Sequence, residues 1–261
     1  MLDTHTHILW NIDDGSKNQC MSLQMLEIAA RSGTKAIFAT PHVIERANKP
    51  SWEEIKEKTQ QLRQLCAEAQ IDIMLYPGAE VQMNWELLPE LGAAGAYCLN
   101  GGRYLLVELP AAEIPAYADE FWYELELKGI TPILAHPERY QQLRENPDLL
   151  LLWRRRGMLM QCNSGSFTGM FGSSVCENAK VLLANGLVDL LGSDGHRSEG
   201  RNTDMSRAAA VIRQLAGEEV LRQMTETNPQ AILKNQEIEL KQPKVFLEDK
   251  LKSFWQKLFG K

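Results

Sequence analysis

The chain has 261 residues, of which 44% are hydrophobic and 24% are charged, and its formal net charge at pH 7 is −6. A single large α/β domain of this length is common, and an acidic balance offers no attraction for a nucleic-acid backbone, so no nucleic-acid partner is expected. The longest apolar run, residues 149–153, is too short to cross a bilayer, and the first residues lack the basic and apolar regions of a secretory signal. We therefore expect a cytoplasmic protein.

Apolar runs alternate with helix-like stretches along most of the chain. The strands are expected at residues 2–8, 36–40, 71–76, 104–109, 130–135, 158–162 and 187–191. The helices are expected at residues 18–32, 51–69, 84–94, 115–128, 139–156, 173–185 and 203–216. Four of these helices end at a glycine that precedes a strand, at Gly33, Gly129, Gly157 and Gly186. Apolar strands separated by helices predict a parallel sheet covered by helices. About seven such units favour a distorted seven-stranded β/α barrel, and a doubly wound open sheet is the alternative.

The composition changes late in the chain. A short helix is predicted from Asn228-Pro229 to Lys234, and a polar stretch follows it. Beyond Pro243, apolar residues from Phe246 to Phe259 recur at helical spacing with lysines among them. This pattern predicts a C-terminal amphipathic helix that packs on the barrel or on another subunit, with a membrane surface or a partner protein as the alternative. We therefore divide the chain into a barrel domain, residues 1–240, and a helical tail, residues 241–261.

The cysteines give no sign of a disulfide framework or of a catalytic thiol. The five are Cys20, Cys66, Cys98, Cys162 and Cys176, and they form no C-x-x-C pair. A thiol phosphatase needs an arginine six residues after its cysteine, and none of the five has one. Cysteine-based phosphate chemistry is therefore disfavoured.

All five histidines lie at or just beyond the carboxyl end of a predicted strand, or in the adjacent turn. His5 and His7 share one face of the first strand, because a spacing of two places both rings on the same side. The others follow later strands, at His42, His136 and His196. Parallel barrels gather these strand ends on one face, where their active sites lie. Five unrelated structural histidines would require five coincidences, so a shared site is the better interpretation.

Carboxylates are predicted on the same face. Glu80 ends the third strand, Glu108 lies inside the apolar fourth strand, and Asp194 follows the seventh. A carboxylate in an apolar run is costly without a cation, so Glu108 is expected to have one as its partner. Asp13 and Asp14 open the loop after the first strand, where capping a turn is as good an explanation as ligation. Imidazoles and carboxylates without thiolates suit Mn²⁺, Fe, Zn²⁺ or Mg²⁺.

These motifs resemble a known family. His5-Thr6-His7, Asp13-Asp14-Gly15, Thr40-Pro41-His42, Gly78-Ala79-Glu80, the block from Ala135 to Tyr140 and Ser193-Asp194-Gly195-His196 are similar to motifs of the polymerase-and-histidinol-phosphatase (PHP) superfamily. The likeness is greatest to bacterial manganese-dependent protein-tyrosine phosphatases of capsular and exopolysaccharide operons, and it covers residues 1 to about 235. Relatives often have a second histidine where this chain has Val43, and an asparagine where it has Arg197.

The resemblance implies a distorted seven-stranded β/α barrel with two or three ions, most simply Mn²⁺. The first ion would be bound by His5, His7, Glu80 and Asp194. The second would share Glu80 and add Glu108 and His136, and the third would be bound by Asp14, His42 and His196. Arg139 and Arg201 match the arginines that bind the substrate phosphate in the family.

The resemblance also implies a function, which is the hydrolysis of phosphotyrosine on a protein substrate, a bacterial tyrosine kinase of polysaccharide export. A metal-bridging hydroxide is expected to attack phosphorus. Asp13 is the candidate general acid, although a phenolate with a pKa near ~10 needs little help to leave. Two alternatives remain open: a phosphoesterase of the same superfamily that acts on histidinol phosphate or a nucleotide, and a non-catalytic module that metals stabilise.

Overall fold

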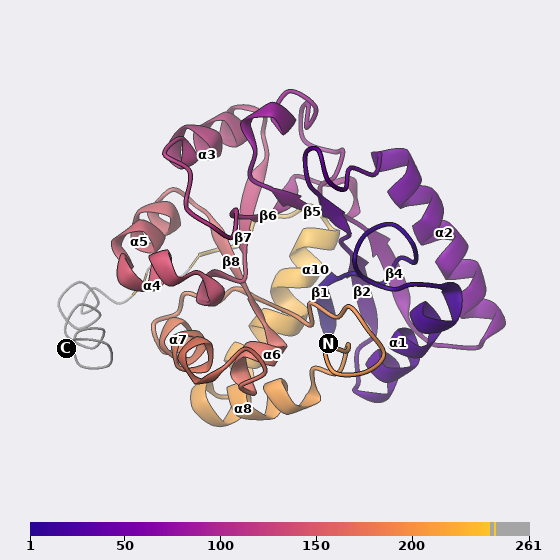
Figure 1. Ribbon diagram of the computed structural model, residues 1–261. Helices are drawn as coiled ribbons and strands as arrows, with labels where there is room; N and C mark the ends of the chain where they lie inside the picture. The colour runs from indigo at the N-terminus through magenta and orange to yellow at the C-terminus, as the bar shows by residue number, and fades with distance from the viewer. Residues whose placement is uncertain (241–242, 244–261) are drawn as a thin grey trace.

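Parallel strands alternate with helices along the chain, and the strands curl into a ring that most of the helices cover from outside (Figure 1). The structure, a computed structural model, describes residues 1–240 and residue 243. The strands are β1 (Leu2–Thr6), β2 (Ala36–Ala39), β3 (His42–Val43), β4 (Met74–Pro77), β5 (Glu80–Gln82), β6 (Tyr104–Glu108), β7 (Thr131–Ala135), β8 (Leu159–Asn163) and β9 (Leu190–Gly192).

The helices lie between these strands and after them. The α-helices are α1 (Gln19–Arg31), α2 (Trp52–Glu68), α3 (Ala118–Leu127), α4 (Gln141–Glu145), α5 (Asp148–Arg155), α6 (Ser164–Phe167), α7 (Ser173–Ala184), α8 (Ser206–Ala216), α9 (Glu218–Arg222) and α10 (Asn228–Leu233). Short helical turns are η1 (Trp85–Leu87), η2 (Leu99–Gly101), η3 (Pro137–Arg139) and the π-helical η4 (Gln223–Thr227).

The strands form two parallel sheets with the orders β1-β2-β4 and β3-β5-β6-β7-β8-β9. Backbone hydrogen bonds join the first strand to the segment that follows the last. The N–H of Asp194 donates to the carbonyl of His5 at 2.7 Å, and the N–H of His7 donates to that of Gly195 at 3.0 Å. The parallel arrangement therefore curls until its two ends meet, which an open doubly wound sheet does not do.

The α/β class and the parallel strands agree with the sequence prediction, but the number of strands differs from it. In the described part of the chain, two of the seven expected strands are each replaced by two short ones. Thr40 and Pro41 separate β2 from β3, and Gly78 and Ala79 separate β4 from β5. Proline has no N–H to donate and glycine weakens a strand, so each path bends where these residues lie. The amphipathic helix predicted over residues 241–261 lies outside the described residues.

Local sequence signals explain why several helices begin and end where they do. The side chain of Asn18 accepts a hydrogen bond from the N–H of Met21 and begins α1, and Ser51 caps α2 in the same way through Glu54. The prediction that this helix ends at a glycine is confirmed, because Gly33 lies just beyond α1 and has a left-handed φ of 88°. The helix predicted over residues 84–94 is wrong: only η1 forms there, since Pro89 and Gly92 oppose a longer helix.

Alternate residues of each strand face two different cores. On β6, Leu105 and Val107 belong to the large core between strands and outer helices, whereas Tyr104 and Leu106 belong to a smaller core that includes residues of five strands. Ile232 of α10 packs into that smaller core, and Figure 1 shows α10 in the middle of the ring. The alternation confirms that these strands are buried on both faces.

The segment after α10 closes the end of this inner core that lies at the amino ends of the strands. The hydroxyl of Tyr104 donates to the carbonyl of Gln236 at 2.6 Å, and the N–H of Arg103 donates to Asn235 Oδ1 at 2.9 Å. The opposite end, where the strands finish, carries the histidines and acids.

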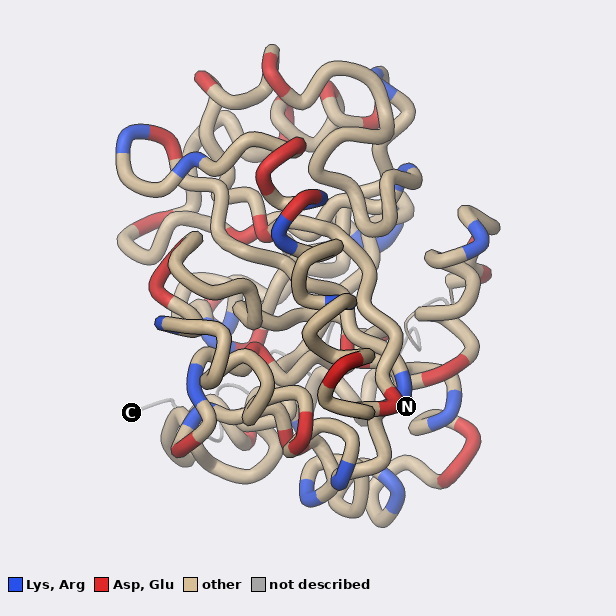
Figure 2. Tube along the Cα trace, turned by 90° about the vertical axis from the view of Figure 1, so that its right-hand side faces the viewer, with Lys and Arg blue, Asp and Glu red and all other residues tan. Residues whose placement is uncertain are grey.

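Among the described residues, none of the helices combines the length and the apolar character needed to cross a membrane. In the view of Figure 2, Lys and Arg positions are interspersed with Asp and Glu positions along the trace. This mixing fits the modest negative net charge of the chain.

Candidate metal centre

Nine imidazole and carboxylate side chains meet at the carboxyl ends of the strands. They are His5, His7, Asp14, His42, Glu80, Glu108, His136, Asp194 and His196, the same nine residues that the sequence analysis selected as ligands. They come from β1, β3, β5, β6 and the turns after β1, β7 and β9. Because the strands are parallel and curled, residues almost 190 positions apart in the chain lie within contact distance.

Glu80 is the centre of this cluster. Its Oε2 lies 3.1 Å from His5 Nε2, 3.2 Å from His7 Nε2 and 3.0 Å from His42 Nδ1. Its other oxygen, Oε1, lies 2.9 Å from His136 Nε2. The side chain is almost completely buried, with 1% exposed. A carboxylate that contacts four imidazoles through both oxygens has the geometry of a bridging ligand.

The atoms of the cluster face each other without satisfying each other. Within the described residues, Glu80 Oε2, Asp194 Oδ1, His42 Nδ1 and His136 Nδ1 are buried and make no geometrically acceptable hydrogen bond. The Nε2 atoms of His5 and His7 lie only 3.1 Å apart, where at most one proton can be shared between them. Buried lone pairs that converge in this way need a partner. Divalent cations supply that partner, and the donor set of nitrogen and oxygen suits them.

Three groups of side chains are compact enough to bind one ion each. His5, His7 and Glu80 form the first, and Asp194 joins it, because its Oδ1 lies 3.6 and 3.3 Å from the two histidine Nε2 atoms. The second group contains Glu80, Glu108 and His42. In this group His42 Nδ1 lies 3.4 Å from Glu108 Oε1. His136, which the resemblance assigns to the same ion, contacts the other oxygen of Glu80.

The third group lies nearest to solvent. It contains Asp14, His42 and His196, with His7 behind them. Asp14 Oδ1 lies 3.3 Å from His196 Nε2 and 3.8 Å from His42 Nε2. The Asp14 side chain is 67% exposed, whereas the ligands of the first group are buried. An ion bound here would therefore be the one most accessible to an incoming substrate.

The pKa shifts show how strongly these groups depend on one another. Burial opposes charging of His5, but Glu80 and Asp194 outweigh it and raise the pKa of the imidazole. Burial likewise opposes ionisation of Glu80, but His5 and His42 hold its pKa well below the usual value. In the metal-free cluster the pKa shifts thus favour an ionised Glu80 and a protonated His5, and a bound cation would displace that proton.

Hydrogen bonds from behind fix which nitrogen of two of the imidazoles faces the centre. His7 Nδ1 donates to Asp13 Oδ2 at 2.7 Å, and His196 Nδ1 donates to the carbonyl of Asp194 at 2.9 Å. Both arrangements leave Nε2 free to ligate, as in carboxylate–histidine–metal triads. Burial opposes ionisation of Asp13, but His7 outweighs it and lowers the pKa of the carboxyl. The structure thus places Asp13 behind a ligand.

Two polar residues on β8 support the centre, and the sequence analysis missed them. His5 Nδ1 donates to Gln161 Oε1 at 2.9 Å, and Gln161 Nε2 donates to Asn163 Oδ1 at 3.0 Å. Asn163 Nδ2 in turn donates to Asp194 Oδ2 at 2.5 Å. This chain of amides joins two ligands that lie far apart in sequence. Polar side chains two residues apart at the end of an apolar strand were the available signal, the same one that identified His5 and His7.

Replacing Gln161 by leucine is expected to weaken binding of Mn²⁺ by about 10- to 100-fold, because the orienting partner of a ligand is lost. The dissociation constant of the metal-free protein for Mn²⁺, measured by calorimetric titration, checks this. Gln61→Leu is the matched control, since Gln61 lies exposed on α2. An affinity of Gln161→Leu within twofold of the wild type would show that the amide chain does not orient the site.

Two arginines extend from the rim of the cluster toward Asp194. Arg139 Nη1 lies 3.3 Å from Asp194 Oδ2, and Arg201 Nη2 also donates to that oxygen. Both guanidinium groups lie over the ring of Phe171, at 4.7 and 5.5 Å from its centroid. About a third of each arginine side chain remains exposed. They can therefore contact an anion that approaches the cluster from solvent.

The backbone is held in unusual conformations where it presents two of the ligands. His136 and Asp194 are in the left-handed region, with φ of 36° and 52°. Such residues cost about 1–3 kcal/mol each and cluster at functional sites. Gly15 is required for a different reason, because a Cβ there would lie 2.2 Å from the carbonyl oxygen of His7. The D-D-G motif thus lets its loop pass directly over the first ligand strand.

The two residues that differ from the motifs of the family, Val43 and Arg197, each lie next to a ligand in sequence. Val43 is buried on β3, next to His42. Arg197 Nη1 donates to the carbonyls of Asp14 and Gly15 at 2.6 and 2.7 Å. This arginine therefore ties the turn after β9 to the loop that carries Asp14.

Known proteins resemble the chain in both sequence and structure. Tyrosine-protein phosphatase YwqE of Bacillus subtilis is 33% identical over 255 residues, which cover 98% of this chain and 100% of YwqE. Tyrosine-protein phosphatase CpsB of Streptococcus pneumoniae is 28% identical over 241 residues, which cover 90% of this chain and 99% of CpsB. A crystal structure from work on YwqE and CpsB, described as unique metal-dependent tyrosine phosphatases, matches 94% of this chain and 98% of its own with a TM-score of 0.87 and 33% identity.

A more distant structure, the histidinol phosphate phosphatase of Lactococcus lactis, matches with a TM-score of 0.53 at 18% identity and shares the fold alone. The model of the family described as "Capsular polysaccharide synthesis, CpsB/CapC" matches residues 1–234. That range includes every ligand of the centre and both arginines. The chain therefore belongs to the CpsB/CapC family of capsular polysaccharide synthesis proteins.

Proposed function

We propose that this chain is a metal-dependent tyrosine phosphatase that hydrolyses phosphotyrosine on proteins. The observation that carries the proposal is the convergence of nine imidazole and carboxylate ligands beside two partly exposed arginines. Relatives at 28–33% identity over nearly the whole chain are named tyrosine-protein phosphatases. We further propose that the substrate is a bacterial tyrosine kinase that regulates capsule or exopolysaccharide synthesis, in line with the description of the family.

Charge favours a phosphate substrate at this site. Four of the ligands are carboxylates, so three divalent cations would leave the cluster with a positive charge of about two. When bound, such cations lower the pKa of water and stabilise charge on phosphoryl oxygens. The donors, imidazole and carboxylate without thiolate, suit Mn²⁺, Fe, Zn²⁺ or Mg²⁺. Among these we propose Mn²⁺ as the native ion, because the motifs resemble those of manganese-dependent tyrosine phosphatases.

The chain's own residues would bind and orient the phosphate. Arg139 and Arg201 hydrogen-bond the same oxygen of Asp194, so their planar groups point toward one place. A guanidinium can donate two parallel hydrogen bonds to phosphoryl oxygens, which fixes the orientation of the group as well as its charge. Phe171 holds both arginines against the rim. The reacting phosphorus would then lie between the arginines and the cluster.

Departure of the tyrosine requires little assistance. A phenolate with a pKa near ~10 leaves more easily than an alkoxide, so a strong general acid is not needed. Asp13 remains ionised and is hydrogen-bonded to His7 and to the backbone of His42. We therefore propose that Asp13 orients His7 and does not donate a proton to the leaving group.

A substrate panel tests the proposal. Metal-free protein is prepared by treatment with a chelator, and the chelator is then removed. This protein should be inactive on a phosphotyrosine peptide, and its turnover should recover when Mn²⁺ is added. Histidinol phosphate, a nucleoside monophosphate and a phosphoserine peptide are compared under the same conditions. A higher kcat/KM for histidinol phosphate than for the peptide would favour the small-molecule alternative. Undiminished hydrolysis without metal would refute the metal dependence, and no hydrolysis of any ester would favour the non-catalytic alternative.

A further inference from the structure

A cleft of about 570 Å³ opens directly beside the metal centre. Two ligands, Glu108 and His136, and the rim residue Arg139 line its inner end. Residues 109–112, which follow β6, form one wall, and α4 forms the other. The cleft is thus continuous with the site at which the phosphate is proposed to bind, and its volume lies within the range of about 300–1,000 Å³ that is usual for ligand sites.

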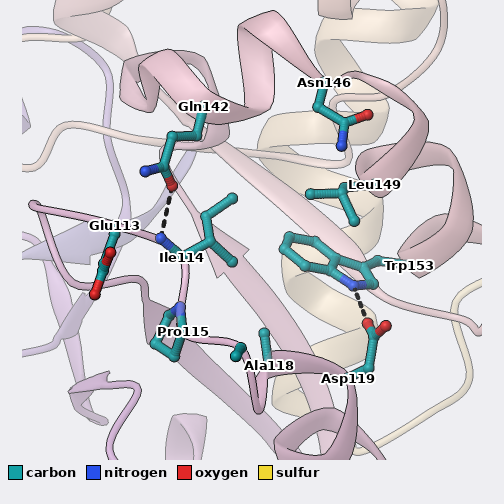
Figure 3. A pocket seen from close by; sticks show the side chains of 10 residues that line it. Glu113, Ile114, Pro115, Ala118, Asp119, Gln142, Asn146, Leu149 and Trp153 are labelled. Carbon is teal, nitrogen blue, oxygen red and sulfur yellow. Dashed lines mark hydrogen bonds between the residues drawn. The ribbon is translucent and has the colours of Figure 1, made fainter.

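The two walls of the cleft are tied together by side chains that follow Arg139 in sequence. The hydroxyl of Tyr140 accepts from the N–H of Leu109 at 2.9 Å and donates to its carbonyl at 3.3 Å. Gln142 Oε1 accepts from the N–H of Ile114 at 2.6 Å, a bond drawn in Figure 3. The loop is therefore fixed at both of its ends. A cleft that is already formed costs little ordering free energy when a ligand enters.

The chemistry of the loop wall selects the occupant. Pro110, Ala111 and Ala112 offer an apolar surface, and the two alanines are small and exposed. A flat aromatic ring would cover this surface, with its phosphate at the inner end beside Arg139. A phosphorylated serine has no ring, so it would leave the same surface uncovered. The cleft therefore favours an aryl phosphate over an alkyl phosphate by the apolar area that the ring buries.

From this arrangement we propose that the cleft between residues 109–112 and α4 is the leaving-group subsite, which binds the tyrosyl ring and the adjacent chain of the substrate. This inference rests on the proposed function, because it places the leaving group of that reaction. The proposed subsite makes residues 109–112 responsible for specificity toward aromatic phosphates. These residues contribute no metal ligand, and Glu108 precedes them.

A substitution that fills the cleft tests the subsite. In the full-length, Mn²⁺-loaded protein, Ala112→Trp should raise KM for a phosphotyrosine peptide by about tenfold or more, because the indole occupies the space of the ring. Inhibition by inorganic phosphate should stay within twofold, since phosphate contacts only the inner end. Metal content, measured by elemental analysis, should be unchanged. Ala111→Trp, on the same wall, should act in the same direction.

Ala116→Trp is the matched control. Ala116 is exposed on the same loop but lines a separate cavity, the one shown in Figure 3, in which Trp153 and Leu149 form the far wall. Its KM for the peptide should equal that of the wild type.

The outcomes separate the subsite from the reaction itself. If both cleft variants keep a wild-type KM for the peptide, the subsite lies elsewhere and the inference is overturned. A parallel loss of phosphate inhibition would also overturn it, because the phosphate site would then be what the indole disturbs. A wild-type protein that is inactive on the peptide would refute the proposed function, and the inference with it, before any variant is compared.

Discussion

Replacement of Asp194 by alanine is expected to lower kcat/KM for a phosphotyrosine peptide by about 10³-fold or more, because it removes a ligand and the common anchor of both arginines. Asp194 is fully buried and contacts His5 and His7 through Oδ1, while Oδ2 accepts from Asn163 and both arginines. Few single substitutions would change so many contacts at once. Steady-state kinetics and elemental analysis of bound metal together measure the effect.

The variant should nevertheless fold. The carboxylate lies beyond the end of β9, outside both apolar cores, and the arginines that it releases are close to solvent. Far-UV circular dichroism should therefore match the wild type. Asp72→Ala serves as control, because Asp72 is exposed and pairs with Lys35 at 3.0 Å. Turnover of Asp194→Ala at the wild-type rate would mean that the cluster is not the catalytic centre.

Arg201→Lys is expected to lower kcat/KM by about 10²- to 10³-fold while the metal content stays constant. Lysine retains the positive charge but not the planar fork that matches two phosphoryl oxygens. The loss should appear mainly as weaker inhibition by inorganic phosphate and as a lower kcat. Arg207→Lys is the control, since Arg207 is exposed on α8. If Arg201→Lys keeps kcat/KM within threefold, a point charge is sufficient and bidentate binding is not used.

The candidate ligands could be selected from the sequence because each lies on a recognisable strand or in the turn after one. His5 and His7 share a face by period two, and His136 and Asp194 come directly after apolar runs. In a parallel fold, that position alone brings residues to one end of the sheet. The selection therefore required the topology but no knowledge of the distances between the side chains.

Other features could not be predicted because they depend on tertiary contacts. Gln161 and Asn163 support the centre only because β8 lies beside β9 and the turn after β9 is joined to β1, and strand order is not visible in one sequence. The expected helix over residues 139–156 is two helices, α4 and α5, since Pro147 interrupts it. The proline could have predicted that break. The hydrogen bond between the N–H of Leu109 and the hydroxyl of Tyr140 could not be predicted, because it joins distant parts of the chain.

The closure between β1 and the turn after β9 has a consequence for synthesis on the ribosome. The first ligands, His5 and His7, emerge at once, but their partners Asp194 and His196 are added only after about three quarters of the chain has been made. The inner core is completed later still, after Ile232 has been synthesised and can pack into it. A nascent chain therefore lacks the complete first and third groups of ligands, and the enzyme can bind its full set of metals only after β1 has met the turn after β9.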